Sequence, residues 1–285
     1  MQVYYDGSHS VNFWDPKTDP NFDSEHNPWK NSWGAFHLIP SSRPVIAPPP
    51  VKKSTIEVIG ANSLIDLTEV PRGFPTYENR TGTLDFYVDD SAPNYDWAKI
   101  YHDVKQYFHG RRLRMYLDDE PSSYYEGRFE INNWKTGKNI SQISLDYDLD
   151  PFALSMFSTL EPWLWDPFDF LNMDIPTVDD TNFKDLTVPA GETSATVCYL
   201  SDIVGSMPVI PTFYVSDSDE NGISITVYNS YNAKWSRQIT VHNNSESNGY
   251  TDPLITFSTP TPGSATWLFF SGAGKLSIDF RPGRL

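Results

Sequence analysis

Residues 95–131 read YDWAKIYHDVKQYFHGRRLRMYLDDEPSSYYEGRFEI, and this stretch decides the fold. Its first half carries apolar and aromatic residues at spacings of three and four, which places them on one face of a helix. Those positions are Trp97, Ile100, Tyr101, Val104, Tyr107 and Phe108. Asn94 is a candidate N-cap, because its amide oxygen can accept from the N–H groups of the first turn. Gly110 can adopt the left-handed conformation that ends a helix, so we predict that the helix stops just before it.

The second half of the stretch changes to a period of two. Residues 112–117 alternate arginine or tyrosine with leucine or methionine, as a strand with one buried face requires. Asp118–Ser123 then supplies turn chemistry, and Tyr124–Ile131 has the character of a returning strand. The sequence therefore predicts a helix packed on a hairpin, which is a compact α+β nucleus.

Length and charge restrict the classes of function. A chain of 285 residues can form one large domain or two ordinary ones. The formal net charge of −16 is shared by residues 1–150, with 15 basic and 22 acidic residues, and residues 151–285, with 6 and 15. Such a surface repels phosphate, so we expect no specific nucleic-acid binding. The single cysteine, Cys198, excludes an internal disulfide, and no signal peptide or membrane-inserting segment is expected.

The rest of the first half predicts a mainly β domain. Residues 1–31 are interrupted by Asp-Pro and Asn-Pro pairs and are interpreted as a surface loop after a possible strand at Gln2–Tyr5. Residues 41–50 hold four prolines and must be extended. Strands are expected at Trp33–Ile39, at Ile56–Ile59 and Ser63–Leu67 on either side of a turn, at Tyr77–Asp89 and at Gln142–Leu149.

The second half of the sequence has a different composition and a different pattern of predicted strands. Residues 153–180 are rich in Trp, Phe, Pro and Asp and are interpreted as a connector, with a short helix near Pro151–Leu160. Short strands then follow every 8–12 residues, which is typical of a β-sandwich or jelly roll. They are expected at Thr193–Tyr199, Val209–Val215, Ile223–Tyr228, Arg237–Val241, Leu254–Phe257, Ala265–Phe270 and Leu276–Phe280. We thus predict an N-terminal domain over 1–152, the connector, and a β-sandwich domain over 181–285.

No pattern in the chain indicates a catalytic site. Asp217–Gly222 imitates the first half of a calcium loop, but position twelve is Tyr228, so a polar turn is favoured. Asp118-Asp119-Glu120 is interpreted as a solvated turn rather than an acid–base cluster. The histidines form no metal-binding motif, and no nucleophile motif or phosphate loop is present. We expect no catalytic, cofactor-binding or metal-binding residues, no cofactor and no enzyme activity, and a core role for Cys198.

Two groups of residues leave alternatives open. Arg111, Arg112 and Arg114 follow the helix end, where cations interact favourably with its dipole, or they face acidic groups on a neighbouring subunit. Trp235 and Trp267, with Tyr228 and Tyr231, form either part of a sandwich core or interface, or a stacking platform for a sugar.

Residues 30–152 resemble the N-terminal domain of phage distal tail proteins, which are baseplate hub components of long-tailed phages of Gram-positive bacteria and of prophages. No single matching piece is specific, but many occur in the same order. Residues 148–152, Asp-Leu-Asp-Pro-Phe, depart from the Cys-Asp-Pro-Tyr that relatives often carry. The matching pieces are Trp33-Gly34, Leu38–Pro40, Ser42–Pro44, Pro48-Pro49, Gly60, Leu64–Glu69, Tyr77–Arg80, His109–Arg112, Leu117–Pro121, Tyr124–Arg128 and Asp150–Phe152.

The resemblance implies a structural protein of the virion tail tip, made in the host cytoplasm. It implies an N-terminal ring-forming belt domain, followed by a galectin-like or carbohydrate-module-like sandwich. It also implies a hexamer with a passage for DNA, which docks to the tail-tube protein and to tail-associated, fibre or receptor-binding proteins. The sequence itself also predicts proline-bounded edge strands within residues 30–90. Such strands leave unpaired backbone N–H and C=O groups that a neighbouring copy could bind. The alternative function is a carbohydrate-binding adhesion module acting through the C-terminal sandwich.

Overall fold

The computed structural model of the chain describes residues 9–19, 27–60, 63–70, 75–89, 97–136, 141–160, 183–188, 207–229, 234–235, 238–244, 248–257 and 266–285. The contacts divide the chain into two compact units. Unit 1 comprises residues 1–52 and 77–153, and unit 2 comprises residues 53–76 and 154–285. The sequence interpretation had placed residues 53–76 in the first domain.

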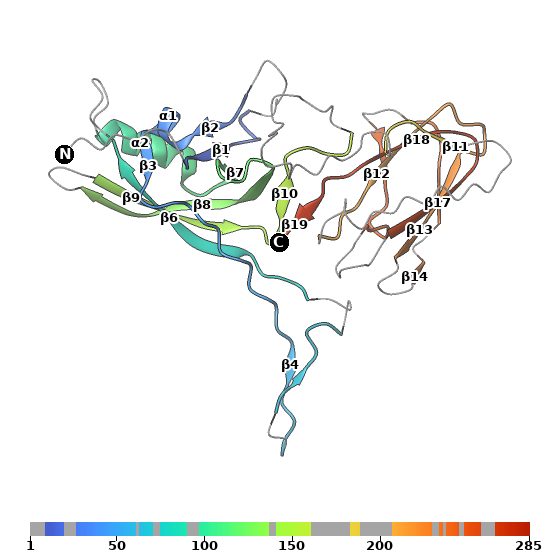
Figure 1. Ribbon diagram of the computed structural model, residues 1–285, viewed down its shortest axis with the longest axis horizontal. Helices are drawn as coiled ribbons and strands as arrows, with labels where there is room; N and C mark the ends of the chain where they lie inside the picture. Colours follow the sequence, from blue (N-terminus) through green and yellow to red (C-terminus); the bar gives the residue numbers. More distant parts are fainter. Residues whose placement is uncertain are drawn as a thin grey trace. The chain divides into compact units, whose positions relative to one another are not determined.

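Unit 1 is built on one antiparallel sheet, shown in Figure 1, with the strand order β2-β1-β7-β8-β9-β6-β3. Both described helices, α1 (Ser32–Phe36) and α2 (Trp97–Phe108), lie in this unit. The strands are β1 (Val11–Trp14), β2 (Lys30–Asn31), β3 (Leu38–Pro40), β6 (Arg80–Val88), β7 (Arg111–Leu117), β8 (Ser123–Thr136) and β9 (Ser141–Leu149).

The predicted nucleus is confirmed. α2 buries Ile100, Val104 and Phe108 in one core with the apolar faces of β7 and β8, whereas Trp97 at its start is 46% exposed. Gly110 has a φ of 76°, the left-handed value expected after a helix end, and its N–H donates to the Phe129 carbonyl 2.8 Å away. The turn from helix to strand is therefore fixed by one glycine and one cross-strand hydrogen bond.

The N-terminal segment differs from its prediction as a loop. β1 is completely buried and pairs with β7, and Phe13 contacts Phe108 edge-to-face with ring centroids 4.7 Å apart. Residues 33–36, predicted as strand, form one helical turn instead. Asn31 causes this change, because its side-chain oxygen caps the N–H groups of Trp33 and Gly34.

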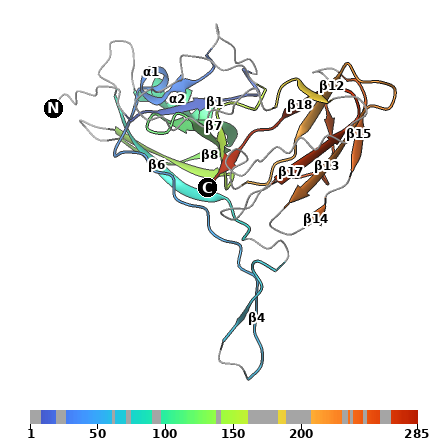
Figure 2. The same ribbon diagram turned by 45° about the vertical axis from the view of Figure 1, so that its right-hand side comes forward.

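Residues 53–70 form a hairpin whose two short strands, β4 (Thr55–Ile56) and β5 (Ile65–Asp66), pair only with each other. Figure 2 shows it as a narrow two-stranded ribbon. The predicted strand–turn–strand pattern is confirmed, although the paired part is shorter than expected. Its described residues are exposed, except for Leu67 and Thr68, which are half-buried.

Unit 2 contains two four-stranded sheets that enclose one core (Figure 2). One has the order β11-β18-β12-β16; in the other, β13 pairs with β14 and β15 on one edge and with β17 on the opposite edge. Ile225, Val227 and Leu268 from the second sheet pack with Phe213 and Ile278 from the first. The strands are β11 (Leu186–Val188), β12 (Thr212–Ser216), β13 (Ile223–Asn229), β14 (Lys234–Trp235), β15 (Ile239–Val241), β16 (Tyr250–Thr251), β17 (Thr266–Ser271) and β18 (Gly274–Asp279).

The predicted fold class, mainly β with one main helix and a β-sandwich, is confirmed. The short helix near Pro151–Leu160 is wrong. This segment contains β10 (Ala153–Ser155) instead. The Ser155 N–H donates to the carbonyl of Pro282, next to β19 (Gly283–Arg284), so this strand makes its backbone hydrogen bond with a distant segment rather than within a helix. Leu254–Phe257 is not a strand and makes only one bridge, from Phe257 to Val209.

Several other expectations, namely Gln2–Tyr5, Asn94, Thr193–Tyr199 and Cys198, lie outside the described residues. Within the part of the chain that the structure describes, no helix has the length and apolar character needed to cross a membrane.

Candidate functional site

The acidic turn Asp118-Asp119-Glu120 is hydrogen-bonded to several segments of unit 1. Asp118 accepts hydrogen bonds from the Ser10 N–H at 3.0 Å and from the Asn12 amide at 2.5 Å. Asp119 lies 2.8 Å from His9 Nδ1 and accepts from Arg43 Nε at 2.9 Å. Glu120 accepts from the hydroxyls of Ser123 and Tyr125. Asp118 and Asp119 lie in an exposed turn, as predicted, and the sequence did not show that all three carboxylates also accept hydrogen bonds within unit 1.

The three arginines that follow α2 find partners in their own chain. Arg111 donates to Asp15 at 2.8 Å. Arg112 pairs with Glu126 at 2.9 Å and also with Asp150. Arg114 pairs with Glu126, and its guanidinium lies over the rings of Trp14 and Tyr124, 4.6 and 5.1 Å from their centroids. These contacts explain the arginines within unit 1 and support neither alternative that the sequence left open.

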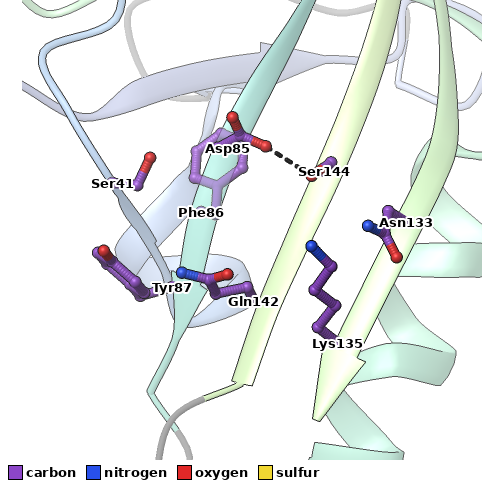
Figure 3. Close-up of a pocket in the computed structure, with 8 residues that line it drawn as sticks. All are labelled: Ser41, Asp85, Phe86, Tyr87, Asn133, Lys135, Gln142 and Ser144. Carbon is purple, nitrogen blue, oxygen red and sulfur yellow. Dashed lines mark hydrogen bonds between the residues drawn. The ribbon is translucent and has the colours of Figure 1, made fainter. Parts of the chain in front are cut away.

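A polar groove crosses the outer face of the unit 1 sheet at the ends of β6, β9 and β8 (Figure 3). Its volume is about 290 Å³. It is lined by Ser41, Asp85, Phe86, Tyr87, Asn133, Lys135, Gln142 and Ser144. Figure 3 shows the Ser144 hydroxyl directed at the Asp85 carboxylate, with an oxygen–oxygen distance of 2.5 Å.

The groove is suited to hydrogen bonding rather than to catalysis. Its lining holds one carboxylate and one amine, Asp85 and Lys135, so the paired carboxylates of glycoside hydrolysis are not available there. The groove was not predicted from the sequence. The available signal was the run of polar residues at alternate positions of β6 and β9, which any solvent-facing sheet also shows.

The β4–β5 hairpin presents a large apolar surface to solvent. Ile56 and Ile65 lie opposite each other and are each 50% exposed. Val58, Ile59 and Leu64 are also exposed. A hairpin that exposes aliphatic side chains on both strands is unusual in a monomeric protein and indicates an interaction surface.

The predicted aromatic group is partly brought together. Tyr228 of β13 is opposite both Trp235 of β14 and Trp267 of β17, so the three positions form one row across three strands. Tyr231 lies outside the described residues. The side chains of Tyr228 and Trp267 are partly exposed on the face away from the sandwich core, which excludes a role in that core.

The acidic loop between β12 and β13 forms a tight turn. The Asn221 N–H donates to Asp219 Oδ1 at 2.9 Å, and Asp217 pairs with Lys275 at 3.1 Å. Among the residues that the structure describes, no three His, Cys, Asp or Glu side chains gather in a way that could hold a metal ion.

Comparison with solved structures finds proteins of similar fold. No family model matches the sequence, and no curated protein matches it. Among solved structures, the chain is similar to the crystal structure of SPP1 Dit (gp 19.1), which is described as a paradigm of the hub adsorption apparatus in phages that infect Gram-positive bacteria. The TM-score is 0.58 and the identity 13%, over 96% of this chain and 99% of that chain. At this identity the likeness shows the fold, and it extends through both units.

Proposed function

We propose that this chain is a structural subunit of a phage tail tip, where copies form a ring that joins the tail tube to the baseplate. The observation that carries the proposal is the fold likeness to the SPP1 hub protein over nearly the full length of both chains. The same family was indicated independently by the order of short motifs in residues 30–152. A likeness confined to the sandwich would have supported only a common binding module.

The ring contact is assigned to the β4–β5 hairpin together with the edge strand β3. β3 ends the strand order of the unit 1 sheet, so within the described residues one of its edges pairs with no other strand. The hairpin supplies exposed aliphatic side chains, and covering the exposed half of Ile56 or Ile65 would contribute about 1 kcal/mol each. A contact between two different surfaces of identical copies gives a ring when the rotation between neighbouring copies closes, and the family suggests six members.

The proposed ring encloses a passage for DNA. Supporting this is the net charge of −16, because an acidic wall lets DNA pass without binding it. The outer face of the unit 1 sheet contributes Asp85, Asp146 and Asp148, whose carboxylates accept hydrogen bonds from Ser144, Thr83 and Asn79. The expected partners are the tail-tube protein and tail-associated or receptor-binding proteins, with the virion tail as location.

The assembly is tested by light scattering and negative-stain microscopy of the purified full-length chain. We expect closed rings at micromolar concentration. The double variant Ile56→Asp, Ile65→Asp should give folded monomers, because charge on both strands opposes burial of the hairpin. Leu254→Asp is the matched control, since Leu254 is 66% exposed in unit 2 and should leave the ring intact.

Two results would contradict the proposal. One is a chain that stays monomeric at tens of micromolar, both alone and mixed with a tail-tube protein. The other is a ring that survives in the hairpin double variant, which would remove the hairpin from the contact. We also propose that the chain has no hydrolytic activity, so release of sugar or peptide ends from host cell walls, abolished by a carboxylate substitution, would overturn a purely structural role.

A further inference from the structure

The outer face of the β13–β17 sheet in unit 2 differs in composition from the outer face of the unit 1 sheet. Directly opposite residues of an antiparallel pair project to the same side of the sheet, so the register defines this face. Tyr228 is paired with Trp267, Thr226 with Phe269, and Ser224 with both Ser271 and Thr240. The alternate residues of β13 and β17 are buried in the sandwich core, which places the named residues on the opposite side. We call this set the aromatic face.

The aromatic face is ordered into an aromatic end and a hydroxyl end. Tyr228, Trp267 and Phe269 are partly exposed, and Trp235 occupies the position beside Tyr228 on the next strand. Neighbouring strands are about 4.8 Å apart, so the row of three aromatic positions spans about 10 Å, close to two sugar rings. At the other end, the Gln238 amide donates to the Ser224 hydroxyl at 2.6 Å, beside Ser271 and Thr240.

The face carries no acidic or basic side chain at any of these paired positions. This neutrality is unexpected, because residues 151–285 hold 15 acidic and 6 basic residues. The outer face of the unit 1 sheet shows the usual arrangement, with Asp85, Glu130, Asp146 and Arg128 projecting to solvent. Solubility therefore does not account for an uncharged face made of aromatic rings and hydroxyls.

We propose that the aromatic face binds a neutral saccharide chain, with sugar rings stacked on the aromatic end and sugar hydroxyls bonded at the other. Stacking suits Trp and Tyr because one side of a pyranose ring presents only C–H groups to the aromatic face. Short hydroxyl and amide side chains fix the orientation through hydrogen bonds. This binding activity goes beyond ring formation and depends on unit 2, so it can succeed or fail independently of the proposed function.

The charge of the face selects the class of ligand. An anionic wall polymer with repeated phosphates requires lysine or arginine, and none occupies the paired positions. A protein partner that bound through the aromatic rings would have no need of the hydroxyl groups at the other end of the face. A neutral oligosaccharide uses both ends of the face.

The test is calorimetric titration of the full-length chain with neutral oligosaccharides built from glucose, galactose or N-acetylglucosamine, and with poly(glycerol phosphate). We expect at least one neutral oligosaccharide to bind, with little change between about 0.05 and 0.5 M salt. Trp267→Ala and Tyr228→Ala should each weaken binding about tenfold or more. Tyr250→Ala, which removes an exposed aromatic ring from the other sheet, should bind normally.

Folding and assembly controls keep the outcomes distinct. Trp267→Phe retains a ring and should retain most of the binding, while thermal melting and light scattering report whether each variant is folded and assembled. The proposal is overturned if no neutral oligosaccharide binds up to about 10 mM. It is equally overturned if Trp267→Ala binds the sugar as well as the unchanged chain does, or if only poly(glycerol phosphate) binds. A third contradicting result is that Trp267→Ala and Tyr228→Ala no longer assemble but still bind the sugar normally.

Discussion

At the scale of single residues, charged side chains in unit 1 act mainly as hydrogen-bond partners that fix turns. Asp118 illustrates this, because its two carboxylate oxygens accept hydrogen bonds from Ser10 and Asn12 at the start of β1, and the residue itself directly follows β7. Its charge also affects a neighbour: burial, and after it the nearby Asp118 carboxylate, raises the pKa of Tyr116 to about 12. Tyr116 therefore stays neutral at all physiological pH values.

Asp15 should make the stability of unit 1 depend on acidity. Burial raises the pKa of this carboxyl, but hydrogen bonds from the Lys17 N–H and the Arg111 guanidinium outweigh it, so the pKa lies below its ordinary value. A depressed pKa in the folded state stabilises the fold above about pH 4 and stops doing so as pH falls through the folded-state pKa.

We predict that Asp15→Asn lowers the free energy of unfolding at pH 7 by about 1–3 kcal/mol and reduces its decline between about pH 5 and 2. Urea unfolding at several pH values measures both effects. Asp217→Asn is the control, since Asp217 and Lys275 are 68% and 49% exposed and their pair should be worth less than about 1 kcal/mol. Equal losses in the two variants would contradict the role assigned to Asp15.

Gly127 should be irreplaceable because backbone atoms fill the space beside it. A Cβ atom there would lie 2.2 Å from the Asp148 carbonyl oxygen and 2.5 Å from the Leu149 Cα. We predict that Gly127→Ala costs about 3 kcal/mol or more, as an overpacked site that cannot relax. Gly110→Ala meets no atom within 4 Å and should cost only about 1 kcal/mol through its positive φ. Thermal melting distinguishes the two, and a mild effect at Gly127 would refute the steric argument.

At the scale of elements, the chain uses paired strands for two different purposes. β6 lies between β9 and β3 and alternates buried and exposed residues, so it is bound on both edges and on one face. β4 and β5 pair over only two residues each and bury no face. A two-stranded ribbon of this kind is marginally stable alone, which suits a segment that is completed by a partner.

Proline substitution should separate these purposes. Phe86 is paired with Pro40 of β3 on one side and with Ile143 of β9 on the other. Phe86→Pro removes the backbone N–H donor at this central position and should unfold unit 1. Phe86→Leu is the control for the loss of the aromatic ring. Ile65→Pro should break only the hairpin and give folded monomers. Circular dichroism reports the fold and light scattering the assembly, and a folded Phe86→Pro protein would contradict the central position of β6.

At the scale of the whole molecule, two separate cores lie within one chain, and the second begins before the predicted sandwich. Thr159 is completely buried, and its hydroxyl donates to the Ile278 carbonyl at 2.8 Å and accepts from the Phe280 N–H at 2.9 Å. Leu160 packs against the same core. Residues 154–160 are therefore part of unit 2, although the sequence interpretation assigned them to a connector.

We predict that residues 154–285 fold as an all-β unit more stable than residues 181–285. The shorter fragment lacks Thr159, which leaves the Phe280 N–H buried without its acceptor and should cost about 1–3 kcal/mol. Thr159→Val in the longer fragment is the matched control for the hydroxyl alone. Chemical unfolding of the three proteins measures the difference, and equal stability of the two fragments would show that the segment contributes nothing.

The sequence by itself determined the parts of this protein that depend on local period. The helix face of Ile100, Val104 and Phe108, its end at Gly110, and the alternation of β6, β7 and β9 follow from spacing, because a buried face must repeat at the period of its element. The even strand spacing likewise determined the class of the second half.

The tertiary structure decided what depends on contacts between distant residues. β1 has no alternation because both of its faces are covered, so its burial follows only from pairing with β7. Asn31 turns a strand-like segment into a helix through one side-chain cap. The polar groove, the hydrogen bonds that Asp118 accepts and the row of Tyr228, Trp235 and Trp267 arise from register between strands. Register is set by the sum of many weak pairings across the sheet, which no single segment of the sequence contains.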